Sequence, residues 1–391
     1  MAGFPDSMMS AWQRIGRAGR RWDSDAFVLY YARNNPLDRF YASNLHTFLD
    51  KPLDDLVVNP DNEDLIEKHV PSLLFETPGA GVTPDILGNG FYGAASRKLE
   101  SGAQPVRAGQ YRPHMAINLR GSGGGTFVLK EGSSEVGTLS AQQQFREAYH
   151  RAIYMHGGRT YRVKEISQTG SGGEIYLVPV EPFLRTNAYT FPVLSEQDIY
   201  DARQWLIDES VVKAYYGKVL IVETMNSVEE VDERTGEVKD RWVPQLNTAR
   251  FDNAHAFWLH QEPQTDEAAA GITALQHLLR VGALFSIPLD AHDMFPHAVI
   301  KDQKAYIVES YPGGIGIARK TLERWRDILK VGIGVADSCG CLRGCPNCIV
   351  PPRLREELDK VAGINLAQSL LNLSEGPHNF RFAYGLWEPT N

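Results

Sequence analysis

The spacing of apolar positions predicts a strand-rich region from about 111 to 265. Short apolar runs alternate there with Gly/Ser turns, a pattern typical of meandering antiparallel sheet. The predicted strands cover 127–130, 161–166, 174–180, 218–228 and 237–243, and a hairpin at 232–236 joins the last two. Two helices interrupt the region, one at 140–153 and one that begins at Ser195, where Asp198 has capping-box spacing.

Helical spacing dominates the last part of the chain. A helix at 265–285 is predicted by the apolar stripe Ile272, Leu275, Leu278, Leu279 and Leu284. His277 lies in this helix, and we expect a core histidine there, satisfied by a polar network, and no metal ligand. The glycine turn 311–316 opens a helix at 318–330 and could let a phosphate meet the N-terminus of that helix. This helix, with Leu322, Trp325 and Leu329 facing inward, and a final helix at 353–371 are also predicted. The former presents a row of basic residues, Arg319, Lys320, Arg324, Arg326 and Lys330. This row suits either a DNA backbone contact or an ordinary solvated face, and both interpretations stay open.

The first hundred residues divide at Asn34-Asn35-Pro36. Before this break, the apolar run 26–31 predicts a strand that is buried on both faces of a parallel sheet. After it, short helical pieces such as 61–69 lie among Pro- and Gly-rich turns. They fit either a winged-helix-like linker or a loosely packed connector. The whole pattern therefore predicts an α+β multi-domain fold.

Composition adds only broad limits. A chain of 391 residues with 43% hydrophobic content can bury a large core, and its length suggests two or three domains. No run of 18 apolar residues occurs, so we expect no membrane partner. The formal net charge of −8 argues against general polyanion binding but permits a local basic groove.

All four cysteines fall within ten residues, at Cys339, Cys341, Cys345 and Cys348. The spacing CxC, three residues, CxxC lets four thiolates surround one ion, and structural zinc is the metal that it favours. Disulfides are the first alternative, although no other cysteine could pair with these four. The second is an iron–sulfur cluster, because the last three also spell CxxxCxxC, but only a short tail follows them. The chain opens without a signal-peptide pattern, so we expect a cytoplasmic protein.

Residues 12–20 read WQRIGRAGR and place three arginines beside two glycines. Guanidinium groups in this setting suit a phosphate that gains charge in a transition state. The string resembles motif VI of superfamily-two helicases, with Gln13, Arg17 and Arg20 at the matching positions. The resemblance implies that Arg17 and Arg20 are arginine fingers for ATP and magnesium held by another RecA-like lobe.

Both ends together resemble MrfA-like DEAD/DEAH-type DNA repair helicases, over residues 3 to about 371. The strings that carry the resemblance are GFPDSMMSAWQRIGRAGR, RAIYMHGGRTYRV, YPGGIGIA and CGCLRGCPNC. It implies the C-terminal half of a 3′-to-5′ DNA translocase that binds single-stranded DNA. The implied domains are the tail of the second RecA-like domain at 1–34, a helical linker at 35–110, a strand-rich candidate nucleic-acid platform at 111–265 and a zinc-binding domain at 266–391.

The chain departs from this family at three places. Gln276 replaces an acidic residue before His277, and the loop 290–296 keeps Asp290 and Asp293 but loses an arginine and two glycines. A further cysteine-containing segment is missing after Cys348, although Asp359-Lys360 fits the continuation. The role of the loop is therefore in doubt.

The sequence contains neither GxxxxGK[ST] nor a DEAD or DEAH string. Without a phosphate cradle and an acid to hold magnesium, arginine fingers cannot hydrolyse ATP, so we expect the chain to be inactive alone. It would need an ATPase lobe, encoded upstream or separately. The alternative is a non-enzymatic, zinc-dependent DNA-binding subunit of a helicase complex.

Overall fold

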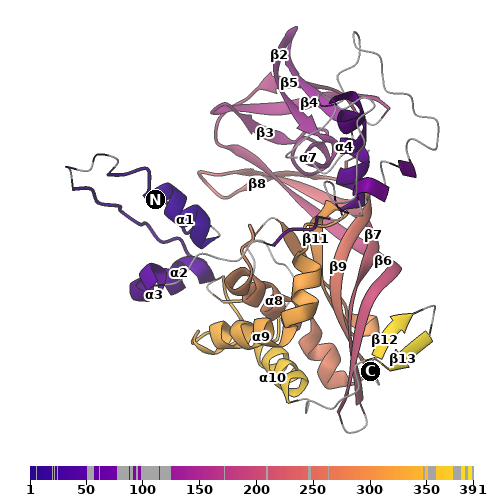
Figure 1. Ribbon diagram of the computed structural model, residues 1–391. Coiled ribbons are helices and arrows are strands. Elements are labelled where there is room, and N and C mark those ends of the chain that lie inside the picture. Colours follow the sequence, from indigo (N-terminus) through magenta and orange to yellow (C-terminus); the bar gives the residue numbers. More distant parts are fainter. Residues whose placement is uncertain are drawn as a thin grey trace. The chain divides into compact units, whose positions relative to one another are not determined.

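The computed structural model describes most of the chain as two compact units (Figure 1). The described residues are 1–50 without 6, 20, 22 and 24; 57–76 without 61; 88, 91–93, 96–97 and 114; 125–350 without 171, 208–209, 245–247, 263, 292 and 347; 358–372; 380–383; and 386–389. Unit 1 comprises 1–62, 196–219 and 254–391, and unit 2 comprises 63–195 and 220–253. Each unit thus combines stretches that are distant in sequence.

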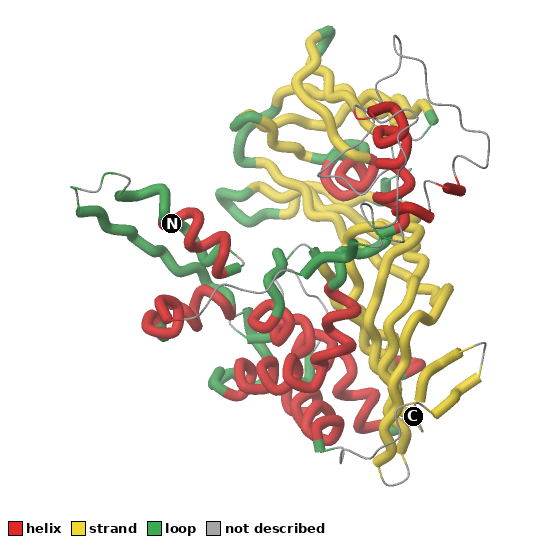
Figure 2. The backbone as a smooth tube through the Cα atoms, in the orientation of Figure 1, coloured by secondary structure: helices red, strands yellow, loops and turns green. Residues whose placement is uncertain are grey.

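The core of unit 1 contains three helices that lie side by side (Figures 1 and 2). They are α8 (Asp266–Ser286), α9 (Ile317–Asp337) and α10 (Lys360–Leu371). The predicted helix at 265–285 is confirmed as α8. The side chain of Thr265 caps its N-terminus by accepting from the backbone N–H of Ala268. Unit 1 also contains the antiparallel strands β10 (Met294–Val299) and β11 (Lys304–Pro312), with the 3-10 turn η2 (Ile300–Asp302) between them, and the short pair β12 (Phe380–Ala383) and β13 (Leu386–Pro389). β11 pairs in turn with β9 (Thr248–Glu262).

Glycine permits the close approach of α8 and α9. A Cβ atom at Gly282 would lie 1.9 Å from the carbonyl oxygen of Ile328, and one at Gly332 would lie 2.1 Å from that of Leu278. Any side chain would therefore force the helices apart. By length and composition, α8 could also cross a membrane, but 78% of its apolar window is buried inside the structure. This burial is that of a core helix.

The N-terminal segment of unit 1 is held together by aromatic rings and one buried carboxylate. It forms α1 (Met8–Ile15), α2 (Pro36–Ser43) and α3 (Leu45–Asp50). The rings of Phe4 and Tyr41 stack with centroids 4.2 Å apart. Asp38, which is 1% exposed, accepts hydrogen bonds from the backbone of Phe4 and from the Tyr30 hydroxyl, the latter at 3.0 Å. Asp38 therefore joins α2 to the chain on both sides of the segment 12–20, which resembles motif VI.

The prediction of a doubly buried strand at 26–31 is wrong for this structure. Phe27 is 92% exposed, Leu29 76% and Tyr31 71%. The segment forms a single parallel bridge, between Ala2 and Tyr31. Among the described residues no further strand pairs with it, so Phe27, Leu29 and Tyr31 face solvent, whereas Tyr30 packs against the core.

Unit 2 contains a five-stranded sheet with the order β2-β1-β5-β4-β3. Its elements are β1 (Thr126–Glu131), β2 (Ser134–Ser140), β3 (Ile153–His156), β4 (Arg159–Thr169) and β5 (Gly172–Pro179), with α4 (Glu63–Glu76) and α7 (Ala141–Glu147) as helices. The predicted strands at 127–130, 161–166 and 174–180 are confirmed. The prediction that all strands run antiparallel is wrong, because β1 and β5 run parallel. Phe145 from α7 packs into the core of this sheet.

Long strands replace the helix predicted from Ser195. β6 (Leu184–Ile207) runs through Ser195 and Asp198 and lies beside β7 (Ser210–Asp232). Pairing with β7 satisfies the backbone of β6, which outweighs the local capping signal. The predicted hairpin is confirmed, since β8 (Val238–Trp242) pairs antiparallel with β7.

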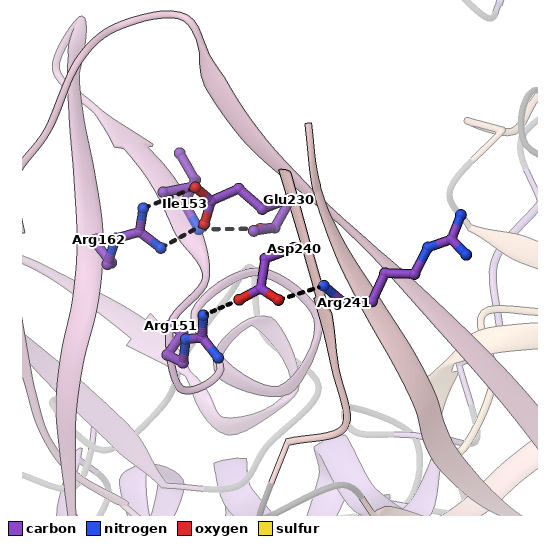
Figure 3. A network of polar contacts seen from close by, with 7 residues as sticks. Arg151, Ile153, Arg162, Glu230, Asp240 and Arg241 are labelled. Carbon is purple, nitrogen blue, oxygen red and sulfur yellow. Dashed lines mark hydrogen bonds and ion pairs between the residues drawn. The ribbon is translucent and has the colours of Figure 1, made fainter. Parts of the chain in front are cut away.

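Ion pairs join this hairpin to the sheet of unit 2 (Figure 3). Arg162 donates two hydrogen bonds to Glu230, at 2.6 and 3.1 Å, and Glu230 is only 7% exposed. Arg151 pairs with Asp240, and its guanidinium lies 4.2 Å from the ring centroid of Trp242. The bidentate, partly buried pair of Arg162 and Glu230 fixes geometry better than the exposed pair of Arg151 and Asp240. Arg151 and Arg162 are thus both paired within the protein.

Candidate metal centre

Four thiols converge directly after α9, in unit 1. All four Sγ atoms lie within 4.8 Å of one another, with Cys339–Cys345 and Cys341–Cys348 both at 3.5 Å and Cys345–Cys348 at 3.9 Å. Four thiolates at ~2.3 Å from a tetrahedral zinc ion have sulfur–sulfur separations of about 3.8 Å. A disulfide would need about 2.05 Å, so the four cysteines are not joined by disulfides. The separations therefore fit one zinc ion.

Tight turns bring the ligands to this point. The left-handed backbone of Gly344, with φ of +105°, precedes Cys345 and reverses the chain. The backbone N–H of Cys345 donates to the Cys348 sulfur at 3.3 Å, and the N–H of Cys348 donates to the Cys345 carbonyl at 3.0 Å. These bonds shape the CxxC half of the site.

The thiols differ in electrostatic environment. The backbone N–H of Cys341 lowers the pKa of Cys339 to about 7, whereas burial raises the pKa of Cys348 to about 12. Cys348 is only 1% exposed. A divalent cation supplies the charge needed to keep such a buried thiol deprotonated, because coordination removes the proton outright.

His277, Asp290 and Asp293 lie outside this cluster. His277 is 3% exposed and belongs to none of the metal-binding groups found among the described residues. It is a core residue, as expected, but neither ring nitrogen has a hydrogen-bond partner among the residues described. Burial lowers its pKa to about 3, assisted by the charge of Arg280. In the altered loop, the Asp293 carboxylate accepts from the backbone N–H of Asp290 at 2.7 Å.

An internal carboxylate occupies the N-terminus of α9. The sequence suggested that the glycine turn at 313–316 could let a phosphate meet this helix end. Glu309, 1% exposed, instead accepts from the backbone N–H of Ile315, from Gly316 at 3.1 Å and from Ala318 at 2.8 Å. These donors are therefore already satisfied, and the phosphate interpretation is wrong.

The motif VI residues lie at the end of α1. Gln13 and Arg17 are exposed, and no carboxylate among the described residues pairs with Arg17. Arg20 lies outside the described residues. Trp12 packs on Phe48 with ring centroids 5.9 Å apart, which fixes α1 on α3. The structure thus presents Gln13 on α1 and Arg17 in the turn that directly follows this helix.

The basic face of α9 is mixed in charge. Lys320 lies 3.1 Å from Glu323, Lys330 lies 3.6 Å from Asp327, and Arg326 donates to a carbonyl oxygen of α10. Most of the predicted row therefore has internal partners. This observation favours an ordinary solvated face over a contact with the DNA backbone.

One contact of the cluster could not be predicted from the sequence, although Asp359-Lys360 fits the family pattern. Lys360, the first residue of α10, is 6% exposed and reaches the backbone of the cysteine segment. A lysine at the start of a helix is usually solvated, so only the three-dimensional structure reveals this position.

Comparisons with known proteins relate this chain to helicases through its zinc-binding segment, its sequence and its fold. Residues 275–349 match the family model described as "MrfA Zn-binding domain". The chain is 24% identical over 375 residues to the "Uncharacterized ATP-dependent helicase YprA" of Bacillus subtilis, covering 89% of this chain and 48% of that protein. It is 23% identical to the "ATP-dependent helicase HRQ1" of Saccharomyces cerevisiae, covering 91% of this chain and 36% of that protein.

Solved structures share the fold. The crystal structure of the "DUF1998 helicase MrfA bound to DNA" matches with a TM-score of 0.56 and 21% identity, over 94% of this chain and 51% of that chain. The predicted resemblance to MrfA-like helicases and the mixed α+β, multi-domain fold are confirmed. The chain spans about half, or less, of the length of these relatives.

Proposed function

We propose that this chain is the C-terminal, DNA-binding portion of an ATP-dependent 3′-to-5′ helicase of DNA repair type. In this proposal Cys339, Cys341, Cys345 and Cys348 bind one structural zinc ion. The observation that carries it is the convergence of four thiols at tetrahedral separations, inside the segment that matches the MrfA Zn-binding domain. The relatives' names, which include ATP-dependent helicases and a helicase bound to DNA, support the same conclusion.

The zinc ion acts as a cross-link. Four protein ligands leave no coordination position for water or substrate, which distinguishes structural from catalytic zinc sites. Cys339 follows α9, and Cys348 belongs to the core of unit 1. Zinc would therefore fix the segment after α9 onto this core.

In this proposal the segment 12–20 places positively charged arginine side chains beside a nucleotide that is bound by another lobe. Arg17 and Arg20 would reach ATP and magnesium bound by a complementing RecA-like lobe, with Gln13 beside them. The extended segment 26–31 supports this arrangement, because its exposed Phe27 and Leu29 and its parallel bridge suit addition to the edge of a partner sheet. The chain alone has no phosphate cradle and would not hydrolyse ATP.

The nucleic-acid partner in this proposal is single-stranded DNA, and the compartment is the cytoplasm. We expect backbone contacts to dominate, so binding should weaken steeply as salt rises. Fluorescence anisotropy with a labelled 30-nucleotide single strand, at 50 and 200 mM salt, tests this expectation. Absence of binding at the lower salt would contradict the DNA-binding proposal.

An ATPase assay tests the motor assignment. We expect no DNA-stimulated hydrolysis by this chain alone, and hydrolysis when a separately produced ATPase lobe is added. Arg17→Ala should abolish the restored activity, whereas Arg14→Ala, at an exposed and variable position of the same QxxGRxGR pattern, should not. Robust hydrolysis without a partner would refute this part of the proposal.

The second candidate is a non-enzymatic, zinc-dependent DNA-binding subunit of a helicase complex. The four-thiol geometry fits this candidate as well, because a structural zinc site needs no ATPase lobe. The two candidates differ in the mixing experiment, because a subunit of this kind would bind DNA and a complete helicase without restoring ATP hydrolysis to an isolated lobe.

A further inference from the structure

The ammonium group of Lys360 lies against the cysteine cluster. The residue begins α10, where Asp359 caps the helix by accepting from the backbone N–H of Ala362 at 2.8 Å. Although the start of a helix is a usual place for a solvated lysine, the residue is only 6% exposed. Its position is therefore imposed by contacts of the side chain.

Three contacts surround the Nζ atom. It donates to the carbonyl oxygen of Cys339 at 2.7 Å and to that of Cys341 at 2.9 Å, and it lies 3.7 Å from the Cys341 sulfur. One ammonium group thus binds both ends of the CxC turn. It joins α10 to a segment that precedes it by about 20 residues.

The charge of this lysine requires a partner. A buried ammonium is costly unless an opposite charge lies nearby, and no carboxylate in the described part of the chain pairs with Lys360. A zinc ion with four thiolates carries a net charge of −2. The cluster itself is therefore the anion that this lysine faces, and the lysine reduces the net charge of the assembly to −1.

We propose that Lys360 is the buried counter-cation of the zinc–thiolate centre and the positioning residue that fastens it to α10. This inference rests on the proposed zinc site. Lys360 binds no metal itself. It stabilises the charged thiolates and holds the CxC turn in the conformation that the metal needs, as hydrogen-bonding partners around metal ligands commonly do.

The predicted effect is on zinc retention. Removing a partner of this kind typically lowers metal affinity by about 10–100-fold. Lys360→Met, which keeps the length of the side chain without its charge, should release zinc to a chelator at least about tenfold faster than the wild type. Lys360→Arg keeps the charge and should lose less. The matched control is Lys330→Met, because Lys330 is a lysine of α9 whose side chain is 63% exposed.

The experiment measures metal content by mass spectrometry and zinc release with a coloured chelator for the four proteins. Fast release from Lys360→Met alone, partly restored in Lys360→Arg, supports the inference. Equal release from all four would overturn it. A wild-type protein that contains no zinc would instead overturn the proposed zinc site, so the two failures are distinguishable.

A labelling measurement covers the case in which Lys360→Met does not fold. In the wild-type protein, an amine-reactive reagent should modify Lys330 readily and Lys360 only after the metal has been stripped. Peptide mass spectrometry gives both rates in one sample. Labelling of Lys360 as fast as Lys330 in the zinc-loaded protein would contradict the burial and the contacts on which the inference stands.

Discussion

His277 should make unit 1 sensitive to acid. It is buried in α8, without a hydrogen-bond partner among the residues described, and burial lowers its pKa to about 3 from an ordinary 6.5. The folded protein therefore keeps the ring neutral while the unfolded chain protonates it. Because the unfolded state binds the proton, stability should fall as the pH drops below about 6.5, and this loss ends only near pH 3.

The size of this loss follows from the two pKa values. Between pH 7 and pH 5 the unfolded chain gains about 2 kcal/mol from protonation of one histidine, while the folded state gains almost none. His277→Leu removes the group. The difference in free energy of unfolding between the wild type and this variant should therefore change by about 2 kcal/mol over this range.

Urea denaturation followed by tryptophan fluorescence provides the assay. All seven tryptophans except Trp242 belong to unit 1, so the signal reports mainly on the unit that contains His277. His150→Leu, at an exposed histidine, is the matched control and should parallel the wild type. A difference between wild type and His277→Leu that stays constant from pH 7 to pH 5 would refute the reasoning.

Three further predictions concern Glu309, Cys345 and Asp232. Glu309→Gln should destabilise unit 1 by roughly 1–3 kcal/mol, because an amide leaves at least one backbone N–H of the α9 terminus unsatisfied; urea midpoints should show this loss, and exposed Glu323→Gln should not share it. Cys345→Ser should lower the zinc content below one ion per chain and reduce the melting temperature; unchanged values would exclude this cysteine as a ligand. The pKa of Asp232 is lowered to about 2, chiefly by the backbone N–H of Arg234, so its stabilising effect should be present above pH 4 and be lost as the pH falls toward 2. The advantage of the wild type over Asp232→Asn in urea midpoint should shrink over that interval, and an advantage that is constant with pH would contradict the shift.

Local patterns in the sequence predicted much of the fold correctly. The apolar stripe of α8, the inward Leu322 and Trp325 of α9, and the hairpin between β7 and β8 all follow from short-range periodicity. The convergence of four thiols also followed from their spacing. These features depend on residues close together in the chain, which is why the sequence reveals them.

Features that depend on distant contacts were not predictable. Ser195 and Asp198 have capping-box spacing, yet pairing with β7 makes the segment a strand. Glu309 fills the helix terminus that seemed open to phosphate, and Lys360 reaches back to the cysteine segment. No periodicity encodes these side-chain contacts. The domain boundaries and the roles of Arg17 and Arg20 stay predictions.

Native mass spectrometry of the intact chain tests the central claim most directly. The four-thiol geometry predicts a mass increase equal to one zinc ion per chain, lost together with the compact charge-state distribution when a strong chelator is added. A compact protein without metal, or one that carries an iron–sulfur cluster, would contradict the zinc-organised domain on which the account rests.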